Sequence, residues 1–143
     1  MVIYLWKNFR EMPWLLRLLT MQALIMVFFL VGSIFPVWSF GISGKSVTYE
    51  EWWSSGAGIF ASVIGILFPI SGYLLLNKNK YARPVYIGSI ILMFLCQVAV
   101  FGLGDQSLLS VFIVILIVVC LFSAYLYLSK SVKEFFVSNK PNI

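Results

Sequence analysis

Acidic side chains are the first residues whose type could support chemistry, because paired carboxylates can act as a general acid and a general base. Glu50 and Glu51 are adjacent, so on a helix their side chains point about 100° apart and do not face each other. The sequence has no histidine, which removes the commonest general base and metal ligand. A Ca²⁺ or Mg²⁺ site would need Glu50, Glu51 and Asp105. We therefore predict no catalytic, cofactor-binding or metal-ligating residue.

The two cysteines, Cys96 and Cys120, both lie in apolar runs. Counted from the turn near Asp105 at about 1.5 Å of helical rise per residue, they differ by roughly 9 Å in depth. A disulfide requires Cα atoms within about 7 Å of each other. We expect both thiols to be unpaired and to serve as small packing groups.

Gln22 and Gln97 are the strongly polar side chains inside the apolar runs, whose central parts contain no Asp, Glu, Lys or Arg. Proton-coupled carriers keep an ionisable group in the membrane. The chain has the length and number of apolar runs of the small multidrug-efflux carriers, but it lacks their acidic residue in the first span, so we reject that resemblance. We expect Gln22 and Gln97 to be buried and to hydrogen-bond another helix; contact with a polar ligand is the alternative.

Four charge-free apolar runs would position these residues. The 143 residues are 62% hydrophobic and 10% charged, against about 45–50% and about 25% in soluble domains. Runs of about 20 residues cross a hydrocarbon core of about 30 Å as helices, and short loops favour antiparallel neighbours. We predict an all-α integral membrane protein, one domain over residues 1–143, with four transmembrane helices in an up-down antiparallel bundle: Leu18–Trp38, Gly56–Leu76, Pro84–Gly104 and Ser107–Ser129.

Basic residues predict the orientation. Three precede the first run, three lie between the second and third, and three follow the fourth, whereas Lys45 lies in the first outer loop. The positive-inside rule then places both termini and the middle loop in the cytoplasm, and we expect a bacterial inner (plasma) membrane. The net charge of +5 reflects this distribution. Without a basic helix outside the spans, we expect no nucleic-acid binding.

Two short segments outside the runs have helical signals. Ile3, Trp6 and Phe9 recur at helical spacing before Pro13, which predicts a short N-terminal helix lying in the membrane interface. An irregular tail with anchoring aromatic residues is the alternative.

The outer loop, residues 39–55, contains Thr48 and Glu51 at the spacing of a capping box, which predicts a short outer-loop helix. Trp52 and Trp53 follow at once. They would serve either as headgroup anchors or as a recognition surface.

The second run carries a stripe of small residues, Ala57, Ala61 and Gly65. Such a stripe lets helices approach closely, either inside the bundle or against a partner. Pro69 should bend this helix by removing a backbone hydrogen bond. In transporters such breaks line binding sites, whereas in ordinary bundles they only bend a helix.

Two functions of different classes remain. In the first, the chain is a non-enzymatic accessory, assembly or immunity-type subunit that binds another membrane protein or a second copy of itself. In the second, it is a small carrier or a protein that binds lipid or another hydrophobic ligand. The absence of a catalytic motif makes us favour the first and expect no enzymatic activity.

Overall fold

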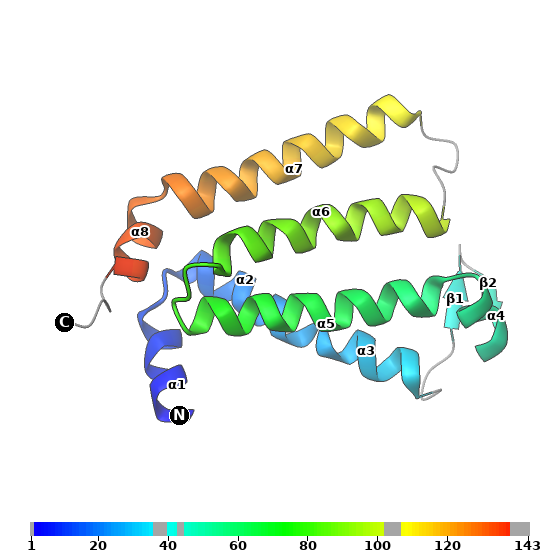
Figure 1. Ribbon diagram of the computed structural model, residues 1–143, viewed down its shortest axis with the longest axis horizontal. Coiled ribbons are helices and arrows are strands. Elements are labelled where there is room, and N and C mark those ends of the chain that lie inside the picture. Colours follow the sequence, from blue (N-terminus) through cyan, green and yellow to red (C-terminus); the bar gives the residue numbers. More distant parts are fainter. Residues whose placement is uncertain (1, 36–39, 43–44, 102–106, 138–143) are drawn as a thin grey trace.

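The computed structural model describes residues 2–35, 40–42, 45–101 and 107–137. Within these ranges the chain is mostly helical, and four helical segments are long and apolar enough to cross a membrane (Figure 1). The expected ends of the first and third spans, residues 36–38 and 102–104, lie outside the described residues. The elements in chain order are α1 (Val2–Glu11), α2 (Trp14–Ile25), α3 (Val27–Ile34), β1 (Phe40–Ile42), β2 (Lys45–Val47), α4 (Tyr49–Ser54), α5 (Ala57–Leu76), α6 (Ala82–Phe101), α7 (Leu108–Leu128) and α8 (Lys130–Val137).

The first span consists of α2 and α3 together, from Trp14 to Ile34. Pro13, with φ −51° and ψ 141°, separates it from α1, so Arg17 belongs to the first turn of α2 instead of preceding the span. At Met26 the two helices meet, and the amide of Phe29 donates to the Met26 carbonyl (3.0 Å). This i to i−3 bond is of the tighter 3₁₀ type and marks a local break in the helix.

The second span, α5, is one helix from Ala57 to Leu76 and continues through Pro69. The first span is thus interrupted at Met26, where there is no proline. The second span is a continuous helix through Pro69.

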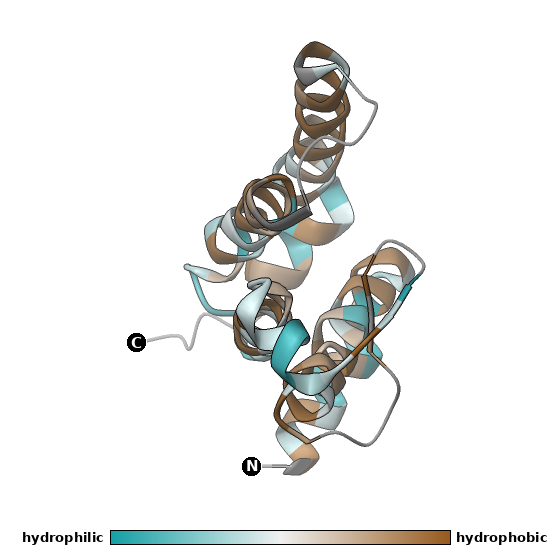
Figure 2. Ribbon diagram, turned by 90° about the vertical axis from the view of Figure 1, so that its right-hand side faces the viewer, coloured by the Kyte–Doolittle hydropathy of each residue, from teal (hydrophilic) through white to brown (hydrophobic). Residues whose placement is uncertain are grey.

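The spans form an open row with α5 in its middle. α2, α3 and α6 pack directly on α5, and α7 packs on α6 (Figure 1). The share of buried residues is 44% in the span of α5 and 6% in that of α7. Apolar residues surround α7, the uppermost helix in Figure 2. The core joins α2, α5, α6 and α7 through a set of buried side chains: Leu16, Leu19, Ala23, Ile64, Phe68, Leu75, Tyr86, Ile90 and Leu126.

The segment between α3 and α5 contains a two-stranded antiparallel hairpin that the sequence did not lead us to predict. β1 pairs with β2 so that Phe40 lies opposite Val47 and Ile42 opposite Lys45. α4 follows, and both bonds of the predicted capping box are present: Glu51 N donates to Thr48 Oγ1 (3.2 Å), and Thr48 N donates to Glu51 Oε2 (2.7 Å). α4 is separate from α5 because Gly56 between them adopts φ 83°, a left-handed conformation that suits glycine.

Candidate functional site

The small-residue stripe of α5 is used inside the chain. Ala57, Ala61 and Gly65 are buried. A methyl group added at Gly65 would collide with the backbone of Leu30, approaching its Cα to 2.9 Å. One turn away from Gly65, the hydroxyl groups of Ser33 and Ser62 are 2.8 Å apart and hydrogen-bond α3 to α5. The observed contacts of the stripe are therefore with α3 of the same chain.

The two outer-loop tryptophans turn toward the bundle. A Cβ atom at Gly58 would lie 2.8 Å from the Trp53 ring and 3.0 Å from the Trp52 ring. Trp52 also stacks on Phe40 (ring centroids 5.0 Å apart), and Trp53 meets Tyr49 edge-on (6.2 Å). Both indole N–H groups are buried without a hydrogen-bond partner among the described residues. These contacts hold α4 and the hairpin on the first turn of α5.

Gln22 and Gln97 are exposed in the single chain, and not buried as expected. Gln97 lies seven and eleven residues after Ile90 and Tyr86, so it belongs to the same face of α6 as these core residues. Buried residues of α6 lie between Ala82 and Ile90, so neighbouring helices cover this half of α6 more than the half that contains Gln97. Cys96 is half-buried, Cys120 is exposed, and both are free thiols.

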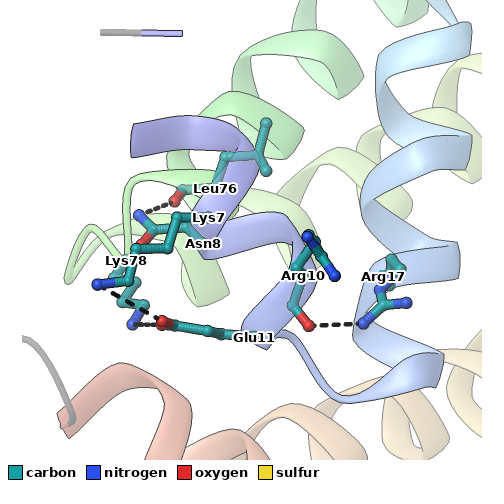
Figure 3. Close-up of polar contacts among 7 residues, drawn as sticks. All are labelled: Lys7, Asn8, Arg10, Glu11, Arg17, Leu76 and Lys78. Carbon is teal, nitrogen blue, oxygen red and sulfur yellow. Dashed lines mark hydrogen bonds and ion pairs between the residues drawn. The ribbon is translucent and has the colours of Figure 1, made fainter. Parts of the chain in front are cut away.

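A polar cluster at the opposite end of the spans was not predicted. Asn8 of α1 is fully buried, and its Nδ2 donates to the Leu76 carbonyl (2.8 Å) at the last residue of α5 (Figure 3). Lys78, in the turn between α5 and α6, pairs with Glu11 (Nζ to Oε2, 3.3 Å), although its side chain is only 3% exposed. Its ammonium also lies 4.5 Å from the centre of the Phe135 ring of α8. One turn thus holds both terminal helices.

Arg17 closes the joint between α1 and α2. Its guanidinium donates to the carbonyl oxygen of Arg10 (2.8 Å; Figure 3) and also to those of Phe9 (3.1 Å) and Met12 (3.3 Å). These carbonyls lie at and just beyond the end of α1, where a helix leaves its last acceptors without partners. A positive charge at this position is also stabilised by the negative end of the helix dipole. We predicted only a topological role for Arg17, since its acceptors are backbone atoms and leave no pattern in side-chain types.

Arg83, near the start of α6, contacts two aromatic rings. Its guanidinium carbon lies 4.3 Å from the centre of the Phe136 ring and 5.6 Å from that of Tyr127. The Nε atom is buried and has no hydrogen-bond partner among the described residues. α6, α7 and α8 therefore meet around a cation whose donors are not used inside the described part of the chain.

The same end of the molecule is strongly basic. α1, α2, the turn between α5 and α6, the first turn of α6, and α8 carry eight basic and two acidic side chains there. They are Lys7, Arg10, Arg17, Lys78, Lys80, Arg83, Lys130 and Lys133, with Glu11 and Glu134. At the other end, the described residues carry Lys45, Glu50 and Glu51. This asymmetry gives the end with α1 and α8 affinity for anions.

Two hollows lie beside α1 at this basic end of the molecule. The first is apolar, of about 280 Å³, and lies between α1 and the helices α2 and α5, lined by Leu5, Trp6, Phe9, Met21, Leu24 and Leu76. The second is polar and open, of about 650 Å³, and lies between α1 and α8, lined by Lys7, Glu11, Met12, Pro13, Ser131, Glu134 and Phe135. The described residues contain no group of three or more His, Cys, Asp or Glu side chains that could hold a metal ion.

The arrangement offers binding surfaces for apolar groups and for anions. Comparison of the chain with protein-family models, with curated proteins and with solved structures finds no match.

Proposed function

We propose that the protein is a non-enzymatic accessory, assembly or immunity-type subunit that acts by binding another membrane protein or a second copy of itself. The observation that carries this proposal is the exposed amide of Gln97 on the core-facing side of α6. An amide inside a bilayer has no water to bond, and leaving its donors and acceptors unmade is costly. A polar group from a second polypeptide would satisfy it.

The packing of α7 supports the same proposal. Its outer half exposes large side chains, among them Leu109 (71%), Phe112 (55%) and Leu116 (66%). Lipid can cover such a surface, so exposure alone does not require a partner. Together with Gln97 on the neighbouring helix, however, it forms a face that is both incompletely packed and polar at one point. We propose this face, the outer halves of α6 and α7, as the partner-binding surface.

The proposal includes an orientation. The spans follow an alternating up-down course in a bacterial inner membrane, with α1 and α8 at the cytoplasmic interface and the hairpin and α4 outside. The distribution of basic residues supports this orientation. Trp52 and Trp53 then act by holding the outer loop on α5, and the partner contacts lie within the membrane.

A photo-crosslinking amino acid at position 97 or 112 tests the partner surface in native membranes. Position 70 is the matched control, because Ile70 is also exposed (47%) but lies on α5. We expect covalent protein adducts from positions 97 and 112 and none from 70. An adduct of twice the chain mass identifies a second copy, and a larger or different mass another protein. Adducts with lipid alone at all three positions would overturn the proposal.

The second candidate function is binding or carriage of a hydrophobic ligand. The apolar hollow between α1, α2 and α5 favours it, because six apolar side chains line a space of about 280 Å³. A Leu24→Trp substitution would fill this hollow. Loss of a co-purified hydrophobic ligand from that variant, with unchanged crosslinking at position 97, would support the carrier and separate the two candidates.

A further inference from the structure

Arg83 differs from the other structured cations at its end of the molecule. Arg17 donates to three backbone carbonyls, and Lys78 is paired with Glu11. The guanidinium of Arg83 lies over the rings of Phe136 and Tyr127, and its buried Nε has no hydrogen-bond partner among the described residues. A guanidinium carries five N–H donors and cannot lose its charge. Contact with aromatic rings restrains such a group without using its N–H donors.

The acidic groups of this end are already paired elsewhere. Glu11 is 3.3 Å from Lys78 and 3.9 Å from Lys7, and Glu134 is 3.9 Å from Lys130. Within the described residues, no carboxylate is therefore within ion-pair distance of Arg83. The matching anion has to come from outside the described part of the chain.

We propose that Arg83 binds the phosphate of an anionic phospholipid at the junction of α6, α7 and α8. A planar guanidinium fork fits two phosphate oxygens, and its charge-assisted bonds are stronger than neutral ones. Basic pockets between spans at the cytoplasmic face are suited to anionic headgroups. The excess of basic residues around Arg83 favours an anionic lipid over a zwitterionic one.

Apolar surface beside Arg83 favours a lipid over a free phosphate ion. Tyr81 (58%), in the turn just before α6, is exposed, and so are Leu121 (65%) and Leu128 (71%) on α7. The acyl chains of a lipid whose phosphate reaches Arg83 would lie along this surface. This inference concerns the inner end of α6 and α7 and does not depend on the proposed partner surface at their outer halves.

The test measures lipid binding to the full chain in detergent by native mass spectrometry, with phosphatidylglycerol and phosphatidylcholine as probes. We expect phosphatidylglycerol to bind the native protein more tightly than phosphatidylcholine. Arg83→Gln should weaken phosphatidylglycerol binding about tenfold, which corresponds to about 1.4 kcal/mol, because the charge-assisted hydrogen bonds to the phosphate are lost. Arg83→Lys keeps the charge but loses the fork, and should fall between the two. Arg10→Gln is the matched control, because it removes one positive charge from the same end at an exposed side chain.

Several outcomes would overturn the proposal. Equal losses in Arg83→Gln and Arg10→Gln would show diffuse charge attraction without a site. Competition by millimolar inorganic phosphate as effective as that by the lipid would show a free-anion site. If Arg83→Gln does not fold, a photoactivatable phosphatidylglycerol added to the native protein decides the question. Its adducts should map to Tyr127, Phe136 or the first turn of α6, and adducts confined to other helices would contradict the proposal.

Discussion

Gly65 and Gly88 show that the effect of a glycine on stability depends on the residues around it. Gly65 is buried where α3 crosses α5, and any side chain there would meet the Leu30 backbone. Gly88 is exposed on α6, with no atom near the site of an added Cβ. In both cases the residue is a glycine within a long apolar helix, and helix propensity alone would favour alanine at either position. The packing between α3 and α5 therefore decides whether replacing glycine by alanine lowers or raises the stability of the protein.

Gly65→Ala should destabilise the protein, because backbone atoms of Leu30 cannot move aside as a flexible side chain can. Overpacking of this kind typically costs about 1–3 kcal/mol. Gly88→Ala should be neutral or stabilise the helix by up to about 1 kcal/mol. Unfolding in detergent, followed by circular dichroism, measures both variants. Equal stability of the two would mean that α3 does not approach α5 at Gly65.

At the scale of elements, α1 depends on a few polar contacts to the bundle. Asn8 is buried and bonds a carbonyl at the end of α5, and Glu11 pairs with a lysine that is itself 3% exposed. The rest of α1 exposes large apolar groups, including Ile3 (87%) and Trp6 (61%). Such a helix can rest in a membrane interface, but its angle to the spans is set by the bonds of Asn8 and Glu11.

Asn8→Ala should loosen α1 without disrupting the spans. It removes the donor to the Leu76 carbonyl at a fully buried position, which typically costs about 1–3 kcal/mol. We expect faster hydrogen exchange in residues 2–11 and unchanged exchange in α5 and α6. Asn77→Ala is the control, because the Asn77 side chain bonds only within its own turn, to the Tyr73 carbonyl (2.9 Å). Slow exchange of α1 in the Asn8 variant would show that apolar contacts suffice.

For the whole molecule, the charge distribution predicts the orientation in a membrane. The basic end carries α1, α8 and the α5–α6 turn, and these three are tied together through Lys78 (Figure 3). The opposite end carries the hairpin and α4, with two acidic residues among those described. A bilayer should orient such a molecule with the basic end in the cytoplasm.

Reporter fusions at the two ends measure this orientation. An enzyme that is active only outside the cytoplasm should be inactive when fused after Ile143 and active when inserted at Lys45. A reporter that is active only in the cytoplasm should give the reverse. Activity of the first reporter at the C-terminus would contradict the proposed orientation, and with it the cytoplasmic position of Arg83.

Local pattern was sufficient for some features of this protein. Uninterrupted apolar runs of about 20 residues predicted four spans, because only a helix satisfies its own backbone groups in lipid. The capping box at Thr48 and Glu51 was confirmed, since both of its bonds lie within four residues. Pro13 gave the boundary after the N-terminal helix, although the first span begins at Trp14 and not at Leu18.

Only the tertiary structure decided which face of each helix contacts which neighbouring helix. The stripe with Gly65 meets α3, the tryptophans meet Gly58, and Gln97 is exposed because α7 covers so little of α6. Asn8 and its acceptor at Leu76 are 68 residues apart, and the acceptor is a backbone oxygen with no mark in the sequence. Helical periodicity shows which residues share a face but not which neighbour covers it, because every span here is apolar nearly all round. Neighbour choice depends on close packing between helices, which is a property of their three-dimensional shapes.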